Sequence, residues 1–255
     1  MSDILGSFQW YELMTTDTEA AKAFYTEVVG WRTQPFEAGG MPYTMVVAGE
    51  EPIGGLCTLP EEAKAMGAPP HWLAYVGTPD VDATLATAQE LGARVYFGPM
   101  DVPTVGRVAI IADPHGAVIG LYTPESGGMD HGEGLGKMAW HELMTGDVDA
   151  ALGFYGTLFG WEKTESMDMG PEHGVYQMYG KGGKTHGGIM RAPQGFNPAW
   201  LYYVTVEDMA ATLDRVKSHG GSVANGPMEV PGGGLAAQCV DPQGAFFALF
   251  SAPKG

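Results

Sequence analysis

Residues 10–17 read Trp-Tyr-Glu-Leu-Met-Thr-Thr-Asp, and residues 140–147 read Trp-His-Glu-Leu-Met-Thr-Gly-Asp. The likeness continues without a gap to a Phe-Tyr pair (24–25 and 154–155) and a Gly-Trp pair (30–31 and 160–161). Twelve of the 22 positions are identical at a constant offset of 130 residues. An ungapped internal repeat of this quality indicates a duplicated structural unit, and it gives each candidate residue a twin for comparison.

The composition narrows the class of protein. The chain has 255 residues, which is enough for two domains of ordinary size, and 45% of them are hydrophobic. A formal net charge of −17 argues against binding to nucleic acids or to anionic membrane surfaces, because both require basic residues. No apolar run approaches the roughly 18 residues that span a membrane, and the N-terminus lacks the pattern of a signal peptide. Cys57 and Cys239 form no Cys-x-x-Cys pair, so we expect buried free thiols and a cytoplasmic location.

Each half of the chain divides into two segments with the same order of predicted elements. In residues 10–59 a strand precedes Asp17, which is suited to cap a helix ending at Gly30, and three short strands follow. Residues 72–122 repeat this order with Asp80 as the cap, and the second half repeats both segments. We therefore predict an α+β fold of four β-α-β-β-β modules, numbered 1 to 4 along the chain. The predicted domains are 1–125 and 138–255, joined by a glycine-rich linker at 126–137.

The order of these motifs resembles the vicinal oxygen chelate superfamily, also called the glyoxalase/bleomycin-resistance/dioxygenase superfamily. The resemblance covers nearly the whole chain. It rests on the strand-Asp-helix pattern with Phe-Tyr and Gly-Trp in modules 1 and 3, and on Asp-Pro-x-Gly at 113–116 and 241–244 in modules 2 and 4. It implies two glyoxalase-like lobes with curved mixed sheets, in which paired modules form a cup around a divalent metal held by His and Glu. Tandem four-module chains of similar length occur among glyoxalases and ring-cleaving dioxygenases.

The ligand positions that the resemblance implies carry side chains unsuited to a metal. Divalent ions need oxygen, nitrogen or sulfur donors. One further position lies within 53–59 and its twin within 186–191, where the sequence alone does not assign it to one residue. We therefore expect no metal cofactor; the alternative is a divalent metal with an unconventional ligand set around Glu12, Glu142 and His186. The aligned positions fall on Trp10, Leu73, Gly120, Trp140, Leu201 and Ala248.

Strand alternation provides the candidate site residues. If Trp10 and Trp140 point into the cup, Glu12 and Glu142 point the same way, because every second residue of a strand shares a face. These two carboxyl groups are the candidate catalytic residues, since an apolar environment raises the pKa of a carboxyl group and suits it to acid or base catalysis. The alternative is a structural Glu that pairs with a tyrosine or with backbone groups. The candidate substrate-binding residues are Trp10, Met14, Tyr75, Trp140, Met144 and Tyr203.

Three functions are compatible with these residues. The leading hypothesis is a metal-independent superfamily member that binds a small, partly apolar organic molecule and, if it is an enzyme, acts as a lyase or isomerase. The second is a metal-dependent lyase or dioxygenase, and the third is a non-catalytic protein that sequesters a drug or metabolite. The sequence leaves open which modules share a cup, and also the oligomeric state, for which a homodimer is one candidate. We expect His141, on the strand face opposite Glu142, to pack against the helix, and His131, in the linker, to be exposed.

Overall fold

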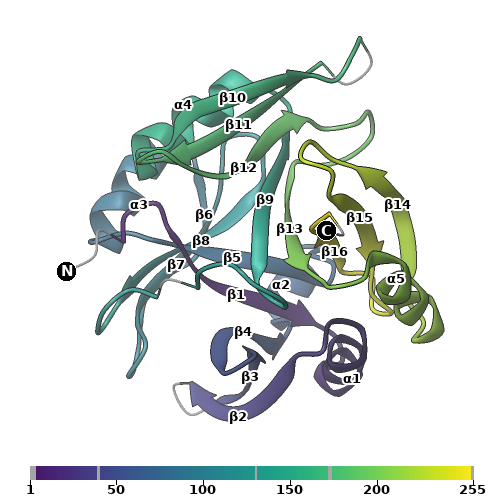
Figure 1. The fold of residues 1–255 in the computed structure, drawn as a ribbon. Coiled ribbons are helices and arrows are strands. Elements are labelled where there is room, and N and C mark those ends of the chain that lie inside the picture. The colour runs from purple at the N-terminus through teal and green to yellow at the C-terminus, as the bar shows by residue number, and fades with distance from the viewer. Residues whose placement is uncertain (1–3, 39–40, 130, 172–173, 254–255) are drawn as a thin grey trace. The chain divides into compact units, whose positions relative to one another are not determined.

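The computed structural model describes residues 4–38, 41–129, 131–171 and 174–253. Its elements follow the predicted order of a strand, a helix and three strands, four times over (Figure 1). The helices are α1 (Thr18–Val29), α2 (Glu61–Ala65), α3 (Val81–Glu90), α4 (Val148–Phe159) and α5 (Met209–Ser218). Module 1 has strands β1 (Phe8–Thr15), β2 (Arg32–Ala38), β3 (Met41–Ala48) and β4 (Glu51–Thr58), and module 2 has β5 (His71–Gly77), β6 (Arg94–Val102), β7 (Gly106–Ala112) and β8 (Val118–Pro124). Module 3 has β9 (Met138–Thr145), β10 (Glu162–Asp168), β11 (Val175–Lys181) and β12 (Lys184–Arg191), and module 4 has β13 (Ala199–Thr205), β14 (Ser222–Glu229), β15 (Leu235–Val240) and β16 (Phe246–Ser251).

The four longer helices each begin at an aspartate. The side chain of each aspartate accepts a hydrogen bond from the backbone N–H three residues further on, which satisfies a donor that the first helical turn leaves unpaired. Helices α1 and α4 end at Gly30 and Gly160, whose left-handed φ angles of 85° and 71° close the last turn. The short helix α2 has no such cap, and the sequence pattern does not predict it. The capping aspartates are Asp17, Asp80, Asp147 and Asp208.

The strands form two eight-stranded mixed sheets, which confirms the predicted α+β class. Modules 1 and 2 contribute one sheet in the order β2-β3-β4-β1-β5-β8-β7-β6, and modules 3 and 4 the other in the order β10-β11-β12-β9-β13-β16-β15-β14. The first and last strands of a module run parallel, whereas the hairpin strands are antiparallel. Strand β6 pairs with β7 over its whole length to Val102. The pairing shifts register on both sides of Phe97 and resumes beyond it.

The chain forms two compact units, and each of them combines segments from both halves. Unit 1 comprises Met1–Trp10, Ala74–Asp130 and Trp140–Trp200. Unit 2 comprises Tyr11–Leu73, His131–Ala139 and Leu201–Gly255. Helices α3 and α4 pack against each other in unit 1, and α1 and α5 do so in unit 2 (Figure 1). The division at 125 and 138 follows the sequence repeat and stays a prediction.

The core of unit 1 contains a buried chain of hydrogen bonds that links residues of modules 2, 3 and 4. Trp200 Nε1–H donates to the hydroxyl of Tyr155 at 3.2 Å, and this hydroxyl donates to Asp113 Oδ2 at 3.0 Å. The other carboxyl oxygen of Asp113 accepts the backbone N–H groups of residues 115, 116 and 117. The Asp-Pro-x-Gly turn is therefore tied directly to the Phe-Tyr motif of helix α4.

Unit 2 contains the twin of this chain. Trp72 Nε1–H donates to the hydroxyl of Tyr25 at 2.9 Å, and that hydroxyl donates to Asp241 Oδ2 at 3.1 Å. Burial raises the pKa of Asp241, and burial followed by the neighbouring Asp241 raises the pKa of Tyr25. Two of the motifs that carry the family resemblance are thus structural partners within each unit.

The Gly-Trp pairs make a second reciprocal contact. In unit 2, Trp31 Nε1–H donates to the carbonyl of Gly136 at 2.7 Å, and in unit 1, Trp161 Nε1–H donates to the carbonyl of Gly6 at 2.8 Å. Gly6 has a φ of 81°, and a Cβ at this position would lie 2.5 Å from the carbonyl oxygen of Phe159. Only glycine fits at this position. Each indole therefore binds the carbonyl of a glycine that lies just before the first strand of one half, β1 or β9.

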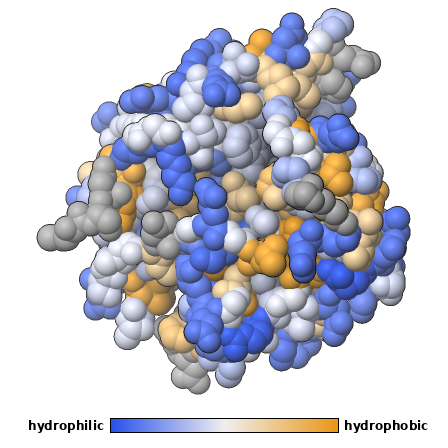
Figure 2. Space-filling view, viewed as in Figure 1, coloured by the Kyte–Doolittle hydropathy of each residue, from blue (hydrophilic) through white to orange (hydrophobic). Residues whose placement is uncertain are grey.

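The surface shows no continuous apolar region on the face seen in Figure 2, where hydrophobic residues form separate patches among hydrophilic ones. Single exposed hydrophobic residues are normal on soluble surfaces and do not by themselves mark a binding site. Among the residues that the structure describes, no helix is both long enough and apolar enough to cross a membrane.

Candidate functional site

The two faces of β9 differ in burial, as the alternation in the sequence predicts. His141 and Leu143 are buried on one face, whereas Trp140 and Met144 are half-buried on the other. Glu142 lies between Trp140 and Met144 on this second face and is only 6% exposed. A carboxyl group with so little exposure requires hydrogen-bond partners.

Tyr176 of β11 is one of these partners. Its hydroxyl donates to Glu142 Oε2 at 3.0 Å and accepts a hydrogen bond from Trp140 Nε1–H at 2.7 Å. The indole can only donate, so the hydroxyl proton is directed towards the carboxyl group. The three side chains therefore form one Trp140–Tyr176–Glu142 chain within unit 1.

Strand register places further side chains on the same face, because residues paired across neighbouring strands project to the same side. Glu142 pairs with Gly188, which also pairs with Met178, and Met144 pairs with Met190. The aromatic and methionine side chains of this face are half-buried, so it is apolar and reachable from solvent. The set, named here the module 3 face, is Trp140, Glu142, Met144, Met167, Tyr176, Met178, Gly188 and Met190.

Two adjacent glycines of β12 make this arrangement possible. A Cβ on Gly188 would lie 2.0 Å from the ring of Tyr176, so the ring packs directly on the glycine backbone. A Cβ on Gly187 would lie 1.8 Å from the carbonyl oxygen of His141. Because both positions lack a side chain, β12 approaches β9 closely and Tyr176 reaches Glu142.

Unit 2 carries the twin of this face on module 1. Glu12 pairs with Gly55, and a Cβ on Gly55 would lie 2.2 Å from the ring of Tyr43. Glu12 and Tyr43 are half-buried. Trp10, which belongs to unit 1, is also half-buried. The residues that register assigns to the module 1 face are Glu12, Met14, Phe36, Tyr43, Met45, Gly55 and Cys57.

Cys57 is a poor candidate for nucleophilic chemistry on this face. Burial, followed by the nearby charge of Glu12, raises the pKa of the Cys57 thiol. The thiol therefore stays protonated, whereas a reactive cysteine needs a lowered pKa. Both cysteines are free, as predicted; Cys239 is buried, but Cys57 is half-buried rather than fully buried.

Tyr75 and Tyr203 lie on the first strands of modules 2 and 4, in units 1 and 2 respectively. Tyr75 is 8% exposed and its ring lies against Gly120, with which it is paired. Tyr203 is 6% exposed, pairs with Ala248 and accepts a hydrogen bond from Gln238 Nε2 at 3.2 Å. Their predicted role in substrate binding stays a prediction.

Register also assigns the ligand position that the sequence leaves open. In module 2, the last-strand position Gly120 pairs with Tyr75, two residues beyond the first-strand position Leu73. In modules 1 and 3, the residues two positions beyond Trp10 and Trp140 are Glu12 and Glu142. The equivalent last-strand positions are therefore the residues that pair with Glu12 and Glu142. These partners are Gly55 and Gly188.

The residues at these eight positions do not fit a divalent metal. They are two tryptophans, two leucines, three glycines and an alanine, and none offers a side-chain donor atom to a metal. Tyrosine rings pack on the three glycines, in the space into which a ligand side chain would project. Within the described ranges, no three His, Cys, Asp or Glu side chains are grouped so that they could hold a metal ion.

Two histidines of unit 1 have structural surroundings. His141 stacks on Phe8 with ring centroids 3.6 Å apart, and its Nδ1 bonds to the carbonyl of His186 at 2.9 Å. His141 is therefore buried on the face opposite Glu142, whereas its expected packing against the helix stays a prediction. Burial, followed by Lys184 and Lys181, lowers the pKa of His186 to about 4. His186 is therefore neutral at pH 7, among aromatic rings that include Phe8.

The expected exposure of His131 is wrong. This linker residue is 8% exposed, and its Nδ1 lies 3.0 Å from Glu51 Oε1. Lys137 Nζ donates to Glu51 Oε2 at 2.6 Å, and it also donates to the carbonyl of His131. The linker is therefore fastened to module 1 within unit 2, because one carboxylate holds two of its side chains.

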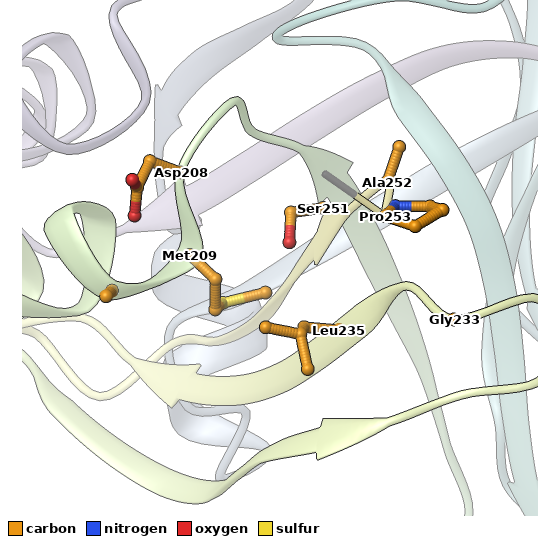
Figure 3. Close-up of a pocket in the computed structure, with 8 residues that line it drawn as sticks. Asp208, Met209, Gly233, Leu235, Ser251, Ala252 and Pro253 are labelled. Carbon is orange, nitrogen blue, oxygen red and sulfur yellow. The ribbon is translucent and has the colours of Figure 1, made fainter. Parts of the chain in front are cut away.

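A small pocket of unit 2 lies apart from the predicted residues (Figure 3). The side chains of Met209 and Leu235 converge on it from α5 and β15, with Ser251 of β16 beside them. Its volume is about 140 Å³, whereas ligand pockets usually measure roughly 300 Å³ or more. None of the predicted site residues lines it, so this pocket is not the candidate site.

The comparisons identify the family. The model of the Glyoxalase/Bleomycin resistance protein/Dioxygenase superfamily matches residues 7–121 and 137–249, so the chain belongs to this superfamily. The chain is 34% identical over 248 residues to "Putative glyoxylase CFP32" of Mycobacterium tuberculosis, covering 96% of this chain and 94% of that protein. It is 29% identical over 272 residues to the anthracycline biosynthesis protein DauV of Streptomyces sp. (strain C5), covering 96% and 92%.

Solved structures share the fold at low sequence identity. The Mn(II)-bound glyoxalase of Novosphingobium aromaticivorans matches with a TM-score of 0.68 and 16% identity, over 98% of this chain and 83% of that one. An extradiol ring-cleaving dioxygenase of B. fuscum matches with a TM-score of 0.66 and 19% identity, over 99% and 73%. These likenesses support the predicted glyoxalase-like fold, and they say nothing about whether this chain binds a metal.

Sequence reasoning missed Tyr176 and its twin Tyr43. A signal was present: Tyr-x-Met at 43–45 returns at 176–178, and Gly-Gly at 54–55 returns at 187–188. Both pairs have an offset of 133, which differs from the 130 of the first strand and helix. Repeated glycines beside a repeated tyrosine indicate a ring that packs on a backbone.

Proposed function

We propose that the protein binds a small, partly apolar organic molecule without a metal, and that Glu142 and Glu12 serve as its hydrogen-bonding or acid/base groups. The Trp140–Tyr176–Glu142 chain carries this proposal, because it presents a nearly buried carboxyl group on a reachable apolar face. Apolar walls with a few fixed polar groups are the usual composition of a small-molecule site.

Tyr176 gives Glu142 a defined orientation. Because Trp140 donates to the tyrosine hydroxyl, the hydroxyl donates to Glu142 and holds the carboxyl group in place. A pre-oriented carboxyl group loses little conformational entropy when a ligand binds, which favours both recognition and proton transfer. The twin Glu12 has the same relation to a glycine and a tyrosine ring in unit 2.

The names of the relatives support a small-molecule ligand of one of two kinds. One relative is named as a glyoxylase and the other as an anthracycline biosynthesis protein. Both fit a cytoplasmic protein that binds neither nucleic acid nor membranes, and both stay compatible with a homodimer. Neither name decides between catalysis and sequestration.

The test combines metal analysis with ligand binding. Protein purified without an affinity metal and treated with EDTA is titrated with candidate ligands, and quenching of tryptophan fluorescence reports binding. We expect less than stoichiometric metal, binding that EDTA does not reduce, and a roughly tenfold or larger loss of affinity in Glu142→Gln. Glu162→Gln, at an exposed position of β10, is the matched control.

Two results would overturn the proposal. Stoichiometric metal whose removal abolishes binding would establish the metal-dependent alternative. If Glu142→Gln lowers the melting temperature but leaves affinity unchanged, the carboxyl group is structural and does not belong to the site. Turnover of a bound ligand, lost in Glu142→Gln, would distinguish an enzyme from a sequestering protein.

A further inference from the structure

The small pocket of unit 2 contains a buried hydroxyl group (Figure 3). Ser251, the last residue of β16, is 4% exposed, and its oxygen is directed towards the side chains of Met209 and Leu235. Among the residues that the structure describes, none forms a hydrogen bond with Ser251 Oγ. A buried hydroxyl group without a partner is unfavourable, so this group indicates a ligand that would supply the bond.

The twin of Ser251 in unit 1 has both of its hydrogen bonds satisfied. At an offset of 128 residues this twin is Thr123. Thr123 Oγ1 donates to the carbonyl of Thr78 at 2.8 Å and accepts the backbone N–H of Val81, the first residue of α3, at 3.1 Å. The hydroxyl of unit 1 thus links a strand to the N-terminus of a helix. Within the described ranges, Ser251 makes neither of these bonds with unit 2.

A second difference between the units leaves room for the pocket. In unit 1 the guanidinium of Arg107 forms an ion pair with Asp82 at 2.6 Å. The residues at the twin positions of unit 2 are Leu235 and Ala210, and both of them line the pocket. Leucine and alanine are shorter than arginine and aspartate and form no ion pair. The place of the ion pair in unit 1 is therefore a cavity of about 140 Å³ in unit 2.

The N-terminus of α5 adds hydrogen-bond donors to this pocket. Met209 and Ala210, the first two residues of the helix, line it. The backbone N–H groups of a first helical turn have no partner within the helix, and Asp208 accepts that of Ala211 at 3.0 Å. Because the pocket combines the first turn of α5 with the hydroxyl of Ser251, a ligand must offer a hydrogen-bond acceptor.

The charges around the pocket favour a neutral ligand. Asp208 lines the pocket, and Glu229 of β14 pairs with Leu235 of β15. These carboxylates disfavour an anion, and the net charge of −17 acts in the same direction. The positive end of the α5 dipole disfavours a cation. A carbonyl oxygen of an amide or a ketone accepts hydrogen bonds without either repulsion.

The size and the walls of the pocket define the rest of the ligand. The side chains of Met209, Leu235 and Pro253 are apolar, and the thioether of a methionine adapts to the shape of its neighbour. A cavity of roughly 150 Å³ is large enough to hold benzene. The 140 Å³ pocket therefore admits a molecule of about six non-hydrogen atoms.

From these observations we infer that this pocket binds a compact neutral amide or ketone, whose oxygen accepts hydrogen bonds from Ser251 and from the first turn of α5. The site consists of residues of α5, β15 and β16 and of the segment that follows β16. It shares no residue with the module 1 face or the module 3 face, so the inference goes beyond the proposed function.

The test uses NMR spectroscopy of the full-length protein with ¹³C-labelled methionine methyl groups. Met209→Leu identifies the signal of Met209. Four probes of similar size are titrated: N,N-dimethylacetamide is a neutral acceptor, isobutyrate an anion, isobutyramidinium a cation, and benzene lacks a strong acceptor. We expect N,N-dimethylacetamide to shift the Met209 signal saturably, and to bind at least about threefold more tightly than the other probes. Met66, which is 59% exposed, reports general solvent effects and should not show saturation.

Three variants test the role of the hydroxyl group and of the cavity. Ser251→Ala should weaken binding roughly three- to tenfold and leave the melting temperature unchanged or higher, because it removes a buried polar group without a partner. The matched control Thr123→Ala loses both bonds of the twin, so it should lower the melting temperature by roughly 3–10 °C and leave binding unchanged. The double variant Ala210→Asp with Leu235→Arg restores the ion pair of unit 1 and should abolish binding.

Four results would overturn the inference. The first is the lack of a saturable shift of the Met209 signal up to about 100 mM N,N-dimethylacetamide. The second is equal or tighter binding of any other probe, and the third is unchanged binding in Ser251→Ala. The fourth is a melting temperature that falls as much in Ser251→Ala as in Thr123→Ala, which would make the hydroxyl group structural. The proposed function is tested through Glu142 and tryptophan fluorescence, so its failure and the failure of this inference are distinguishable.

Discussion

Removal of the Tyr155 hydroxyl tests whether the Phe-Tyr and Asp-Pro-x-Gly motifs hold unit 1 together. Tyr155 is fully buried, and its hydroxyl donates to Asp113 at 3.0 Å while accepting from Trp200 at 3.2 Å. The substitution Tyr155→Phe keeps the ring and removes both hydrogen bonds. It leaves the indole N–H of Trp200, which is 8% exposed, without this acceptor.

The magnitude follows from the two lost bonds. A hydrogen bond to a charged group contributes about 1.5–3 kcal/mol, and a buried donor left unsatisfied costs about 1–3 kcal/mol. The two contributions overlap, so we expect a loss of about 2–4 kcal/mol in the free energy of unfolding. For a chain of this size each kcal/mol lowers the melting temperature by roughly 2–4 °C, which gives a decrease of roughly 5–15 °C.

Urea unfolding at neutral pH, followed by circular dichroism, measures this loss. Tyr25→Phe removes the twin bonds in unit 2 and should cost a similar amount. Tyr96→Phe, at a tyrosine that is 40% exposed, is the control and should change stability by less than about 0.5 kcal/mol. A Tyr155→Phe variant as stable as the Tyr96→Phe variant would refute the assignment of these motifs to the core.

Three further outcomes are expected. Gly188→Ala should displace the ring of Tyr176, lower the free energy of unfolding by about 1–3 kcal/mol and weaken ligand binding. Near-ultraviolet circular dichroism would detect the displaced ring, and titration would detect the weaker binding. An unchanged aromatic signal would contradict this prediction. Burial lowers the pKa of His186 from 6.5 to about 4, so the stability that the neutral imidazole contributes is complete above pH 6.5 and is lost as the pH falls towards 4. The free energy of unfolding from urea melts should therefore depend less on pH between 4 and 6.5 in His186→Gln than in the native protein. An equally steep pH dependence in the variant would count against this assignment. The hydrogen bond from Lys137 lowers the pKa of Glu51 from 4.5, so the ion pair contributes stability at neutral pH that is lost as the pH falls below 4.5. In urea melts, Glu51→Gln should therefore lower the free energy of unfolding more at neutral pH than below pH 4.5. An equal loss at the two pH values would exclude the ion pair as the cause.

The sequence predicts most of the fold because its signals are local. Aspartate caps, glycine helix ends and the order of short strands all act within a few residues, and the repeat shows each of them twice. The end of β6 was less predictable, since its pairing resumes only after a register shift that depends on β7. The buried environment of His131 was not predictable either, because it depends on Glu51, 80 residues away.

The candidate site was predictable only along single strands. Alternation places Trp140, Glu142 and Met144 together, because a strand determines which of its own residues share a face. Tyr176 belongs to another strand, and its position depends on register and on the absence of a side chain at Gly188. A spacing rule for one strand contains no information on the register between strands.

The reciprocal indole contacts tie each half of the chain to the other half. Trp31 binds the carbonyl of Gly136, and Trp161 binds the carbonyl of Gly6, so each half completes a compact unit with the leading segment of the other. A half expressed alone lacks the glycine carbonyl that its indole binds, and a second copy of the same half could supply the equivalent carbonyl. The tandem chain therefore has the organisation of a segment-exchanged homodimer within a single polypeptide, and two separately produced halves should complement each other when they are mixed.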